Sequence, residues 1–466
     1  MVNLTGLHLE PLVEPVDLSA HPSRQLKVLH AVAICLGVVI DAGIFRSTPN
    51  VAAAVPTESV LYLLWGLGGV LSLVGALCFA ELSSAFPDAG GDYHFLRLAY
   101  GQRVGFLFAW SRFAVIHTGS MALAAFVFGD YLNELVHLGP LGAPCLAAAT
   151  ILCLVLVNLR GVRPGIHTQV GLVSIVLLGL AAVVGSAAWF ALAGRPELAA
   201  GSGAAAAAPG TADPGQIGKA LVFIFLAYGG WSDAATLSAE MRDRRRGILA
   251  ALTIGMSLIA LVYLATNWAF LRVLGLPGLA ISQAPGADLM QAVFGTGGKV
   301  AIVGIVAVTS ISVMNATLIT GARTTYAAAR DVPGLRRVLG VWNKNRGTPA
   351  VAMVAIGSVA LLLVGLGTIT RGGFATMVDY MSPIYWGFLI LSGGALIVLR
   401  IRRPHANRPF RVPLYPLLPL LFIASSTYVL QSSVAYYRAG SLAGLGVLGI
   451  GTVLLFAVRH RRAGRR

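Results

Sequence analysis

A carboxylate interrupts an apolar stretch near the start of this chain. Asp41 lies between the apolar runs 31–39 and 51–55, and Arg46 follows it five residues later. Placing an aspartate at the centre of a membrane helix costs about 2.5–3.5 kcal/mol on insertion scales. Such a residue has to be paired, protonated or wetted by a cavity. Three kinds of chemistry stay open: attraction of a cationic ligand, carriage of a proton, or a local ion pair with Arg46.

A second interruption lies in a later apolar stretch. Residues 227–231 read AYGGW, so Gly229 and Gly230 stand together within it, as Gly43 stands beside Asp41 in the first stretch. Glycine allows a helix to unwind. Non-helical backbone at membrane depth is tolerated where it is packed in protein or lines a wet cavity. We expect the freed N–H and C=O groups to bind a ligand; the alternative is that these glycines only let helices pack closely.

Other polar side chains within apolar stretches are candidates for contact with a ligand or an ion: His117, Ser310, Asn315 and Tyr385. His117 can titrate near neutral pH if it lines a cavity. Arg112 lies five residues before it, and we expect the two to share no tight helical face. Ser310 and Asn315 are explained equally well by hydrogen bonds between helices. Tyr385 is expected to cover the site.

The composition places all these residues in a membrane protein. The chain has 466 residues, of which 57% are hydrophobic and 11% charged, with a mean hydropathy of +0.79. A soluble chain would carry about a quarter charged residues. Apolar windows of about 20 residues, long enough to cross a bilayer, recur throughout. We predict an all-α polytopic protein whose twelve spans lie near 28–56, 60–86, 103–131, 142–159, 166–193, 217–239, 247–272, 288–326, 349–369, 373–399, 411–433 and 440–458.

The net charge of +16 follows this topology. Basic residues gather in alternate loops, for example 242–246, 400–411 and 459–466. The positive-inside rule then predicts two cytoplasmic termini and a multi-pass location in the plasma (bacterial inner) membrane. Anionic membrane lipid is the expected partner of the basic surplus, and nucleic acid is not expected. The four cysteines lie in or beside apolar stretches and are expected to be small buried hydrophobes: Cys35, Cys78, Cys145 and Cys153.

The predicted organisation has one membrane domain in two halves. Its segments are a cytoplasmic N-terminal segment 1–27, a first half 28–193, an external flexible loop 194–216, a second half 217–400, two further helices in 401–458 and a basic cytoplasmic tail 459–466. The loop is rich in Ala, Gly and Pro, which is typical of a flexible linker. No metal-spaced histidine cluster, nucleophile elbow or phosphate-binding loop is present in the sequence, so we expect neither an enzyme nor a cofactor.

Four stretches resemble signatures of the amino acid–polyamine–organocation (APC) superfamily of secondary transporters. They are GVVIDAGIFRSTP (37–49), FAELSSAFPDAGGDYHFLRLAYG (79–101), FLAYGGWSDAATLSAEM (225–241) and TLITGARTTYAAARD (317–331). Their order along the chain is that of the superfamily, and the third is similar to the L-type amino acid transporter branch. The resemblance covers nearly the whole chain. It implies two inverted five-helix repeats in which helices 1 and 6 are broken, with two peripheral helices added.

The resemblance also implies a substrate site between the two broken helices. The carboxylate of an amino acid would accept N–H groups of Ala42, Gly43 and Ile44 at the positive end of a half-helix. Its ammonium would face carbonyls near Ile40 and at 227–228. The expected substrate-binding set is Ile40, Asp41, Ala42, Gly43, Ile44, Leu226, Ala227, Tyr228, Gly229, Gly230 and Trp231. Glu81 and Glu240 end their spans and are each expected to meet a loop arginine in an inner gate; a solvated carboxylate at a helix end is the alternative.

The chain departs from the superfamily pattern at several positions. Asp41 replaces a glycine of the first signature, and Leu226 replaces an aromatic residue. Val176 stands where many members carry a lysine, so the coupling ion, a proton or sodium, stays open. Cys145 is at a span edge rather than in the preceding loop, so no disulfide-linked heavy subunit is expected. The resemblance predicts a symporter or exchanger of amino acids, and Asp41 raises the alternative of an amine, polyamine or cationic amino acid carrier.

The position of Asp41 generates a testable expectation. At the rim of the expected pocket, a carboxylate attracts a substrate ammonium and repels a substrate carboxylate. We expect Asp41→Gly to shift preference from amines or cationic amino acids toward neutral α-amino acids. Asp41→Asn should weaken amine uptake and flatten its pH dependence. Uptake in proteoliposomes at several pH values measures both, and unchanged selectivity and pH dependence in both variants would leave Asp41 a partner of Arg46.

Overall fold

The structure is a computed structural model that describes residues 32, 35–36, 39–40, 43–88, 91–160, 166–194, 213–234, 247–330, 336–342, 348–370, 372–436 and 438–463. Asp41, Ala42, Glu240, the segment 1–27 and most of the loop 194–216 lie outside the described residues. The helices are α2 (Ile44–Ala52), α3 (Glu58–Ala85), α4 (Asp92–Tyr100), α5 (Gln102–Ser111), η1 (Arg112–His117), α6 (Thr118–Val136), α7 (Gly142–Leu159), α8 (Ile166–Leu192), α9 (Pro214–Ala227), α10 (Trp231–Ala234), α11 (Gly247–Ile281), α12 (Pro285–Arg330), α14 (Ala350–Ile369), α15 (Gly373–Arg402), α16 (Leu417–Tyr436) and α17 (Arg438–Ala463).

Nine helices of the described part are long and apolar enough to cross a membrane. They match predicted spans two to five and seven to eleven. The first predicted span is described chiefly through its second half, α2, and the sixth through α9 and the four-residue α10. The twelfth contributes the shorter apolar stretch Ser441–Val453. The chain is therefore a helical multi-pass membrane protein, and the count of twelve spans stays a prediction.

Several predicted boundaries shift for identifiable local reasons. α11 and α12 each run through a kink at a glycine with positive φ, +66° at Gly275 and +67° at Gly295. A left-handed glycine lets the chain turn without ending the hydrogen-bonded run, so the connector between these helices carries short helical pieces that hydropathy alone did not reveal. α16 begins at Leu417 and not at the predicted 411, because prolines at 413 and 416 interrupt the chain before it.

Local sequence explains several helix starts. The Thr57 hydroxyl caps α3 by accepting the Val60 N–H at 3.3 Å. Asp213 caps α9 by accepting the Gly215 N–H at 3.2 Å, and Pro214 occupies the first helical position. Such caps supply acceptors for N–H groups that have no partner inside the helix, and proline at the first position has no N–H to satisfy.

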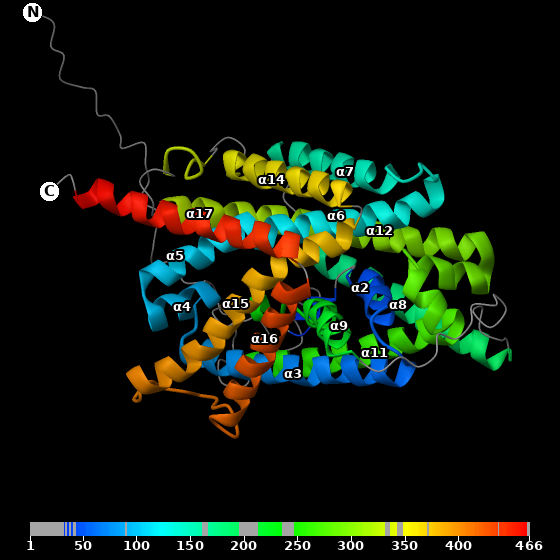
Figure 1. The fold of residues 1–466 in the computed structure, drawn as a ribbon, viewed down its shortest axis with the longest axis horizontal. Helices are drawn as coiled ribbons and strands as arrows, with labels where there is room; N and C mark the ends of the chain where they lie inside the picture. Colours follow the sequence, from blue (N-terminus) through cyan, green and yellow to red (C-terminus); the bar gives the residue numbers. More distant parts are fainter. Residues whose placement is uncertain are drawn as a thin grey trace, which may run out of the picture.

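Many of the long helices run roughly along the long axis of the molecule, whereas α15 crosses them obliquely and α16 runs across that axis (Figure 1). α3 lies along α11 on one side, α7 lies along α14 on the other, and α6 packs against α12 between them. α15 contacts both α16 and α17. The connection from α15 to α16 and the end of α17 lie at the left end of this view, whereas the connection from α6 to α7 lies at the right end.

The prediction that all four cysteines are buried was wrong for two of them. Cys35 and Cys78 are buried, but Cys145 and Cys153 on α7 are exposed. α7 is an outer helix of the bundle, and only 33% of its apolar window is buried. A peripheral span carries apolar residues on its outward face as well, so hydropathy does not separate residues that face the bundle from those that face away.

Candidate functional site

The first helix break lies just before α2. The Ile40 N–H donates to the Leu36 carbonyl at 2.7 Å, which is the last described turn before the break. α2 begins at Ile44, and its first turn presents backbone N–H groups and the positive end of the helix dipole toward the break. Gly43 has a helical φ of −62°, so this position does not use the left-handed freedom of glycine. Asp41 and Ala42 lie between these two described pieces.

The second helix break confirms the predicted interruption at 227–231. α9 ends at Ala227, residues 228–230 form a turn, and α10 begins at Trp231. The Gly229 N–H donates to the Leu226 carbonyl at 2.9 Å. Gly230 has a φ of +93°, a conformation that side chains strongly disfavour. The glycine pair therefore creates the turn that separates the two half-helices.

Tyr263 on α11 joins the two breaks. Its hydroxyl oxygen lies 3.1 Å from the Val39 carbonyl oxygen and 3.0 Å from the Ala227 carbonyl oxygen. Both carbonyls stand at the C-terminal ends of half-helices, where helical donors are missing. A hydroxyl has one proton, so it donates to one of the two carbonyls at a time. This single buried side chain ties together two segments that are almost 190 residues apart in the sequence.

An aromatic cluster holds the Tyr263 ring in place. Its other members are Trp65 on α3 and Tyr228 in the second break. The ring centroids are 5.8 Å apart for Trp65 and Tyr228, 5.6 Å for Trp65 and Tyr263, and 5.1 Å for Tyr228 and Tyr263. The Tyr228 hydroxyl donates to the Trp65 carbonyl at 3.1 Å. A Cβ at Gly69 would lie 3.0 Å from that hydroxyl, so α3 approaches closely because it has a glycine there.

Two other predicted site residues have different surroundings. The Trp231 ring packs edge-on against Phe79, with 5.0 Å between centroids, and also against Phe422 on α16. This ring therefore anchors α10 to α3 and α16. Tyr385 on α15 lies over the second break, because its hydroxyl oxygen would be 3.2 Å from a Cβ at Gly229. Its expected role as a cover of the site stays a prediction.

The prediction that Arg112 and His117 share no helical face was wrong. Both belong to the π-helical segment η1, and the Arg112 Nε lies 3.4 Å from the His117 Nε2. In a π-helix each residue hydrogen-bonds five positions along, so residues five apart stack on one face. His117 is buried, and a Cβ at Gly321 on α12 would lie 3.1 Å from its own Cβ. Nothing in the sequence of this span distinguishes a π-helical turn from an α-helical one.

Asn315 and Ser310 in the eighth predicted span have different surroundings. The Asn158 side-chain amide on α7 donates to the Asn315 Oδ1 on α12 at 2.7 Å. This bond is of the interhelical kind that the sequence left open. The Ser310 hydroxyl is fully buried, and no hydrogen-bond partner is found for it among the described atoms. A contact of Ser310 with a substrate or ion stays a prediction.

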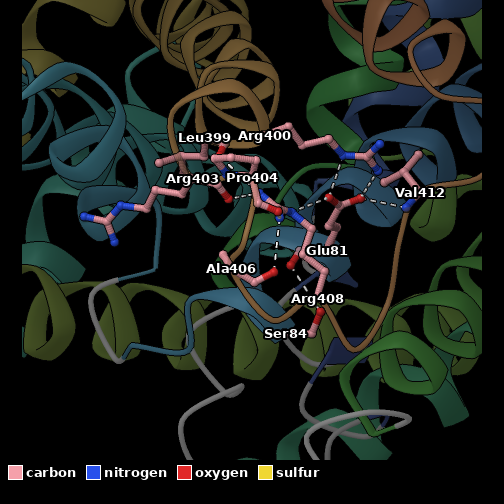
Figure 2. A network of polar contacts seen from close by, with 9 residues as sticks. All are labelled: Glu81, Ser84, Leu399, Arg400, Arg403, Pro404, Ala406, Arg408 and Val412. Carbon is pink, nitrogen blue, oxygen red and sulfur yellow. Dashed lines mark hydrogen bonds and ion pairs between the residues drawn. The ribbon is translucent and has the colours of Figure 1, made fainter.

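Glu81 is the centre of a polar network at the other end of α3 (Figure 2). Arg400 at the end of α15 reaches both oxygens of this fully buried carboxylate, with its Nε 2.8 Å from Oε1. The Val412 N–H donates to Oε2 at 2.7 Å, and the Arg408 Nε lies 3.5 Å from Oε1. The expected arginine contact is thus present, and the role in an inner gate stays a prediction. Arg408 also donates to the Leu399 carbonyl in the last turn of α15 at 3.1 Å and to the Arg403 carbonyl at 2.9 Å.

Comparison with known proteins places these features in a wider group. The sequence profile of the family described as amino acid permease matches residues 26–442. The chain is 28% identical to the b(0,+)-type amino acid transporter 1 of Mus musculus, over 88% of this chain and 82% of the relative. It is 28% identical to the Asc-type amino acid transporter 1 of Homo sapiens, over 91% and 80%. It is 25% identical to the serine/threonine exchanger SteT of Bacillus subtilis, over 88% and 91%.

The tyrosine bridge predicts a measurable effect on stability. Tyr263→Phe removes the donor from two buried carbonyls, and an unsatisfied buried polar group costs about 1–3 kcal/mol. We expect a lower free energy of unfolding in micelles and faster amide hydrogen exchange on both sides of the breaks. The matched control is Tyr380→Phe, which removes an equally buried hydroxyl that donates to the Ala114 carbonyl at 2.8 Å. If both variants exchange alike at the breaks, Tyr263 does not hold them together.

Proposed function

This chain belongs to the amino acid permease family, in the L-type branch of the APC superfamily, and we propose that it is a secondary transporter that moves amino acids by alternating access. The observation that carries the proposal is the pair of helix breaks joined at Tyr263. Broken helices at membrane depth supply oriented backbone groups to a ligand without side-chain charges. Transport of amino acids follows from the family, whereas the mechanism and the substrate are our proposal.

The packing of the two halves supports an inverted repeat. If the spans are numbered one to twelve, spans two and seven are α3 and α11, spans three and eight contain α6 and α12, and spans four and nine are α7 and α14. Each of these three pairs packs together. When two five-helix halves are related by a pseudo-two-fold axis, helices at equivalent positions in the two halves are expected to contact each other. We therefore propose ten core helices in two inverted halves, with α16 and α17 as the two peripheral helices.

The two helix breaks offer complementary charges to a zwitterion. The start of α2 at Ile44 presents N–H groups and positive dipole to a substrate carboxylate. The Val39 and Ala227 carbonyls present negative dipole to a substrate ammonium. Each carbonyl oxygen has two lone pairs, and the Tyr263 hydroxyl can use only one lone pair at a time. The remaining acceptor capacity at this point, close to Gly229 and the Tyr385 hydroxyl, is what an ammonium would use.

One contact bears on the uses of Asp41 that the sequence left open, among them an alternative carrier of amines or cationic amino acids. The Arg46 Nε is 3.0 Å from Asp130 on α6, and its guanidinium also contacts the Gln283 side-chain oxygen. Because Arg46 already has an anionic partner, a local pair with Asp41 is the weakest of the three uses that the sequence left open. An Asp41 carboxylate that acts on a substrate ammonium or a proton is then favoured, and the coupling ion stays open between a proton and sodium.

The proposal includes a location and a set of partners. The chain would lie in the plasma (bacterial inner) membrane with both termini cytoplasmic, in contact with anionic lipid. No disulfide-linked heavy subunit is proposed, although Cys145 is exposed. Its position inside α7, three residues after the helix start, keeps its thiol in the apolar window rather than in the loop before it.

Uptake into proteoliposomes is the direct test. The purified chain should take up at least one member of a panel of radiolabelled amino acids and amines, with saturation and counterflow. Saturable counterflow separates a carrier from a channel, and the pH and sodium dependence of uptake identifies the coupling ion. Absence of saturable uptake of every amino acid in the panel would contradict the proposal.

A substitution in the second helix break tests where the substrate binds. A Cβ at Gly229 would lie 2.8 Å from the Leu226 carbonyl oxygen and 3.2 Å from the Tyr385 hydroxyl. Gly229→Leu should therefore abolish uptake, because the added side chain displaces the Leu226 carbonyl or the Tyr385 side chain from the proposed site, while the protein still inserts. Gly66→Leu on α3 is the matched control, since no atom lies within 4 Å of its Cβ position. Normal uptake by Gly229→Leu would show that the site is misplaced.

A further inference from the structure

Three elements meet in the right-hand half of Figure 1, away from the connection between α15 and α16. They are α2, the last turns of α6 and the connector between α11 and α12. The Arg46 Nε on α2 lies 3.0 Å from the Asp130 Oδ2 on α6, and the same guanidinium contacts the Gln283 side-chain oxygen in the connector. One arginine thus links all three elements.

The residues next to Arg46 and Asp130 connect the same three elements through backbone groups. The Tyr131 hydroxyl donates to the Phe45 carbonyl at 3.4 Å and accepts the Gly286 N–H at 3.2 Å. The Phe45 and Tyr131 rings are also packed edge to face, with centroids 6.1 Å apart. We call this set the outer clamp, defined by Phe45, Arg46, Asp130, Tyr131, Gln283 and Gly286. Consecutive residues on α2 and α6 therefore make parallel connections.

The ion pair of the outer clamp is sheltered from water. The exposed fractions of the Arg46 and Asp130 side chains are 14% and 18%. Arg46 also lies over the ring of Phe374 on α15, 5.9 Å from its centroid. A sheltered pair is screened less by salt than a surface pair, and loss of one partner leaves the other charge in an unfavourable setting. The clamp is therefore sensitive to removal of either charge.

The position of the outer clamp relates it to the helix break. Arg46 is the third residue of α2, within one turn of the N-terminus that faces the break. α2 has nine residues, and its continuous helical run stops at Gly43. A short half-helix that is separated from the rest of its span can change its tilt without bending a continuous helix. The outer clamp fixes that half-helix to α6 and to the connector.

We propose that the outer clamp is the gate that closes the substrate site toward this end, and that the Arg46–Asp130 pair has to open once in each transport cycle. The proposal rests on the alternating access proposed above, because only such a cycle requires access from both ends in turn. It assigns Arg46 and Asp130 a gating role that is separate from substrate contact. In the present structure the gate is closed.

A second ion pair provides a matched control. The Lys299 Nζ on α12 lies 2.9 Å from the Glu134 Oε2 on α6, with exposed fractions of 11% and 34%. Glu134 lies one helical turn beyond Asp130 on the same helix, at the same end of the molecule. This pair joins α6 to the part of α12 that follows the kink at Gly295, and it does not involve α2. If loss of a charge merely destabilises this end of the molecule, variants of both ion pairs should show the same effect. If the Arg46–Asp130 pair is a gate, only variants of that pair should show it.

Hydrogen–deuterium exchange in nanodiscs tests the outer clamp without transport. Asp130→Asn should raise exchange of the α2 amides roughly tenfold or more, because truncating one partner of a sheltered charge pair shifts such equilibria by at least that factor. Glu134→Gln should leave α2 exchange unchanged. Gln283→Ala changes an exposed side chain, so it keeps the fold if Asp130→Asn does not, and it should raise α2 exchange by a smaller factor.

Transport supplies the second measurement. Asp130→Asn should lower the maximal uptake rate and change substrate affinity by less than about threefold, because neither side chain touches the expected site. The swapped pair Arg46→Asp with Asp130→Arg should recover part of the rate, which a purely structural role in α6 would not produce. Equal α2 exchange in Asp130→Asn and Glu134→Gln, or no recovery in the swapped pair, would overturn the gate. If the wild-type chain shows no uptake, the proposed function fails, and the exchange experiment still decides whether the clamp holds α2.

Discussion

Two helices of this chain stop within apolar stretches, and the carbonyl groups freed at those stops need donors where water is excluded. In hydrocarbon every backbone polar group has to be satisfied internally, so such stops survive only if the protein supplies partners. The Tyr263 hydroxyl lies within hydrogen-bond distance of both the Val39 and Ala227 carbonyls and donates to one of them at a time. The ring that carries this hydroxyl is held by Trp65 and Tyr228, and the close approach of α3 depends on glycine at position 69. The geometry of the candidate site follows from this one constraint.

The buried ion pairs at the two ends of the molecule join different kinds of element. At one end Glu81 is fully buried and accepts from Arg400 and from the Val412 N–H, so α3, α15 and the loop before α16 form one connected unit (Figure 2). At the other end Arg46 belongs to a nine-residue half-helix that a break separates from the rest of its span. An ion pair between continuous helices adds rigidity, whereas an ion pair on a separated half-helix can restrain a motion. The same interaction therefore has different consequences at the two ends.

Family membership and substrate choice are separate questions in this protein. The helix breaks use backbone groups, which any sequence with glycine at the required turn can provide, and Gly230 with its positive φ is such a turn. Selectivity depends on the side chains that surround those groups, and here the chain differs from the superfamily pattern at Asp41, Leu226 and Val176. A fold does not by itself fix the substrate, so we propose that these three positions influence the choice of substrate and coupling ion.

Hydropathy and local signals in the sequence were sufficient for the membrane class, for nine spans and for the break at 227–231, because each depends on residues that are adjacent along the chain. Helix starts at Thr57 and Asp213 are equally local. The contacts of Tyr263, the pairing of Arg46 with Asp130 and the bond between Asn158 and Asn315 join residues 36 to 224 positions apart. A tyrosine or arginine in an apolar span indicates from the sequence alone that its polar group needs a partner. Which carbonyl or carboxylate meets it depends on how the helices pack, and in a membrane that packing is set by close contact of small residues and not by hydropathy.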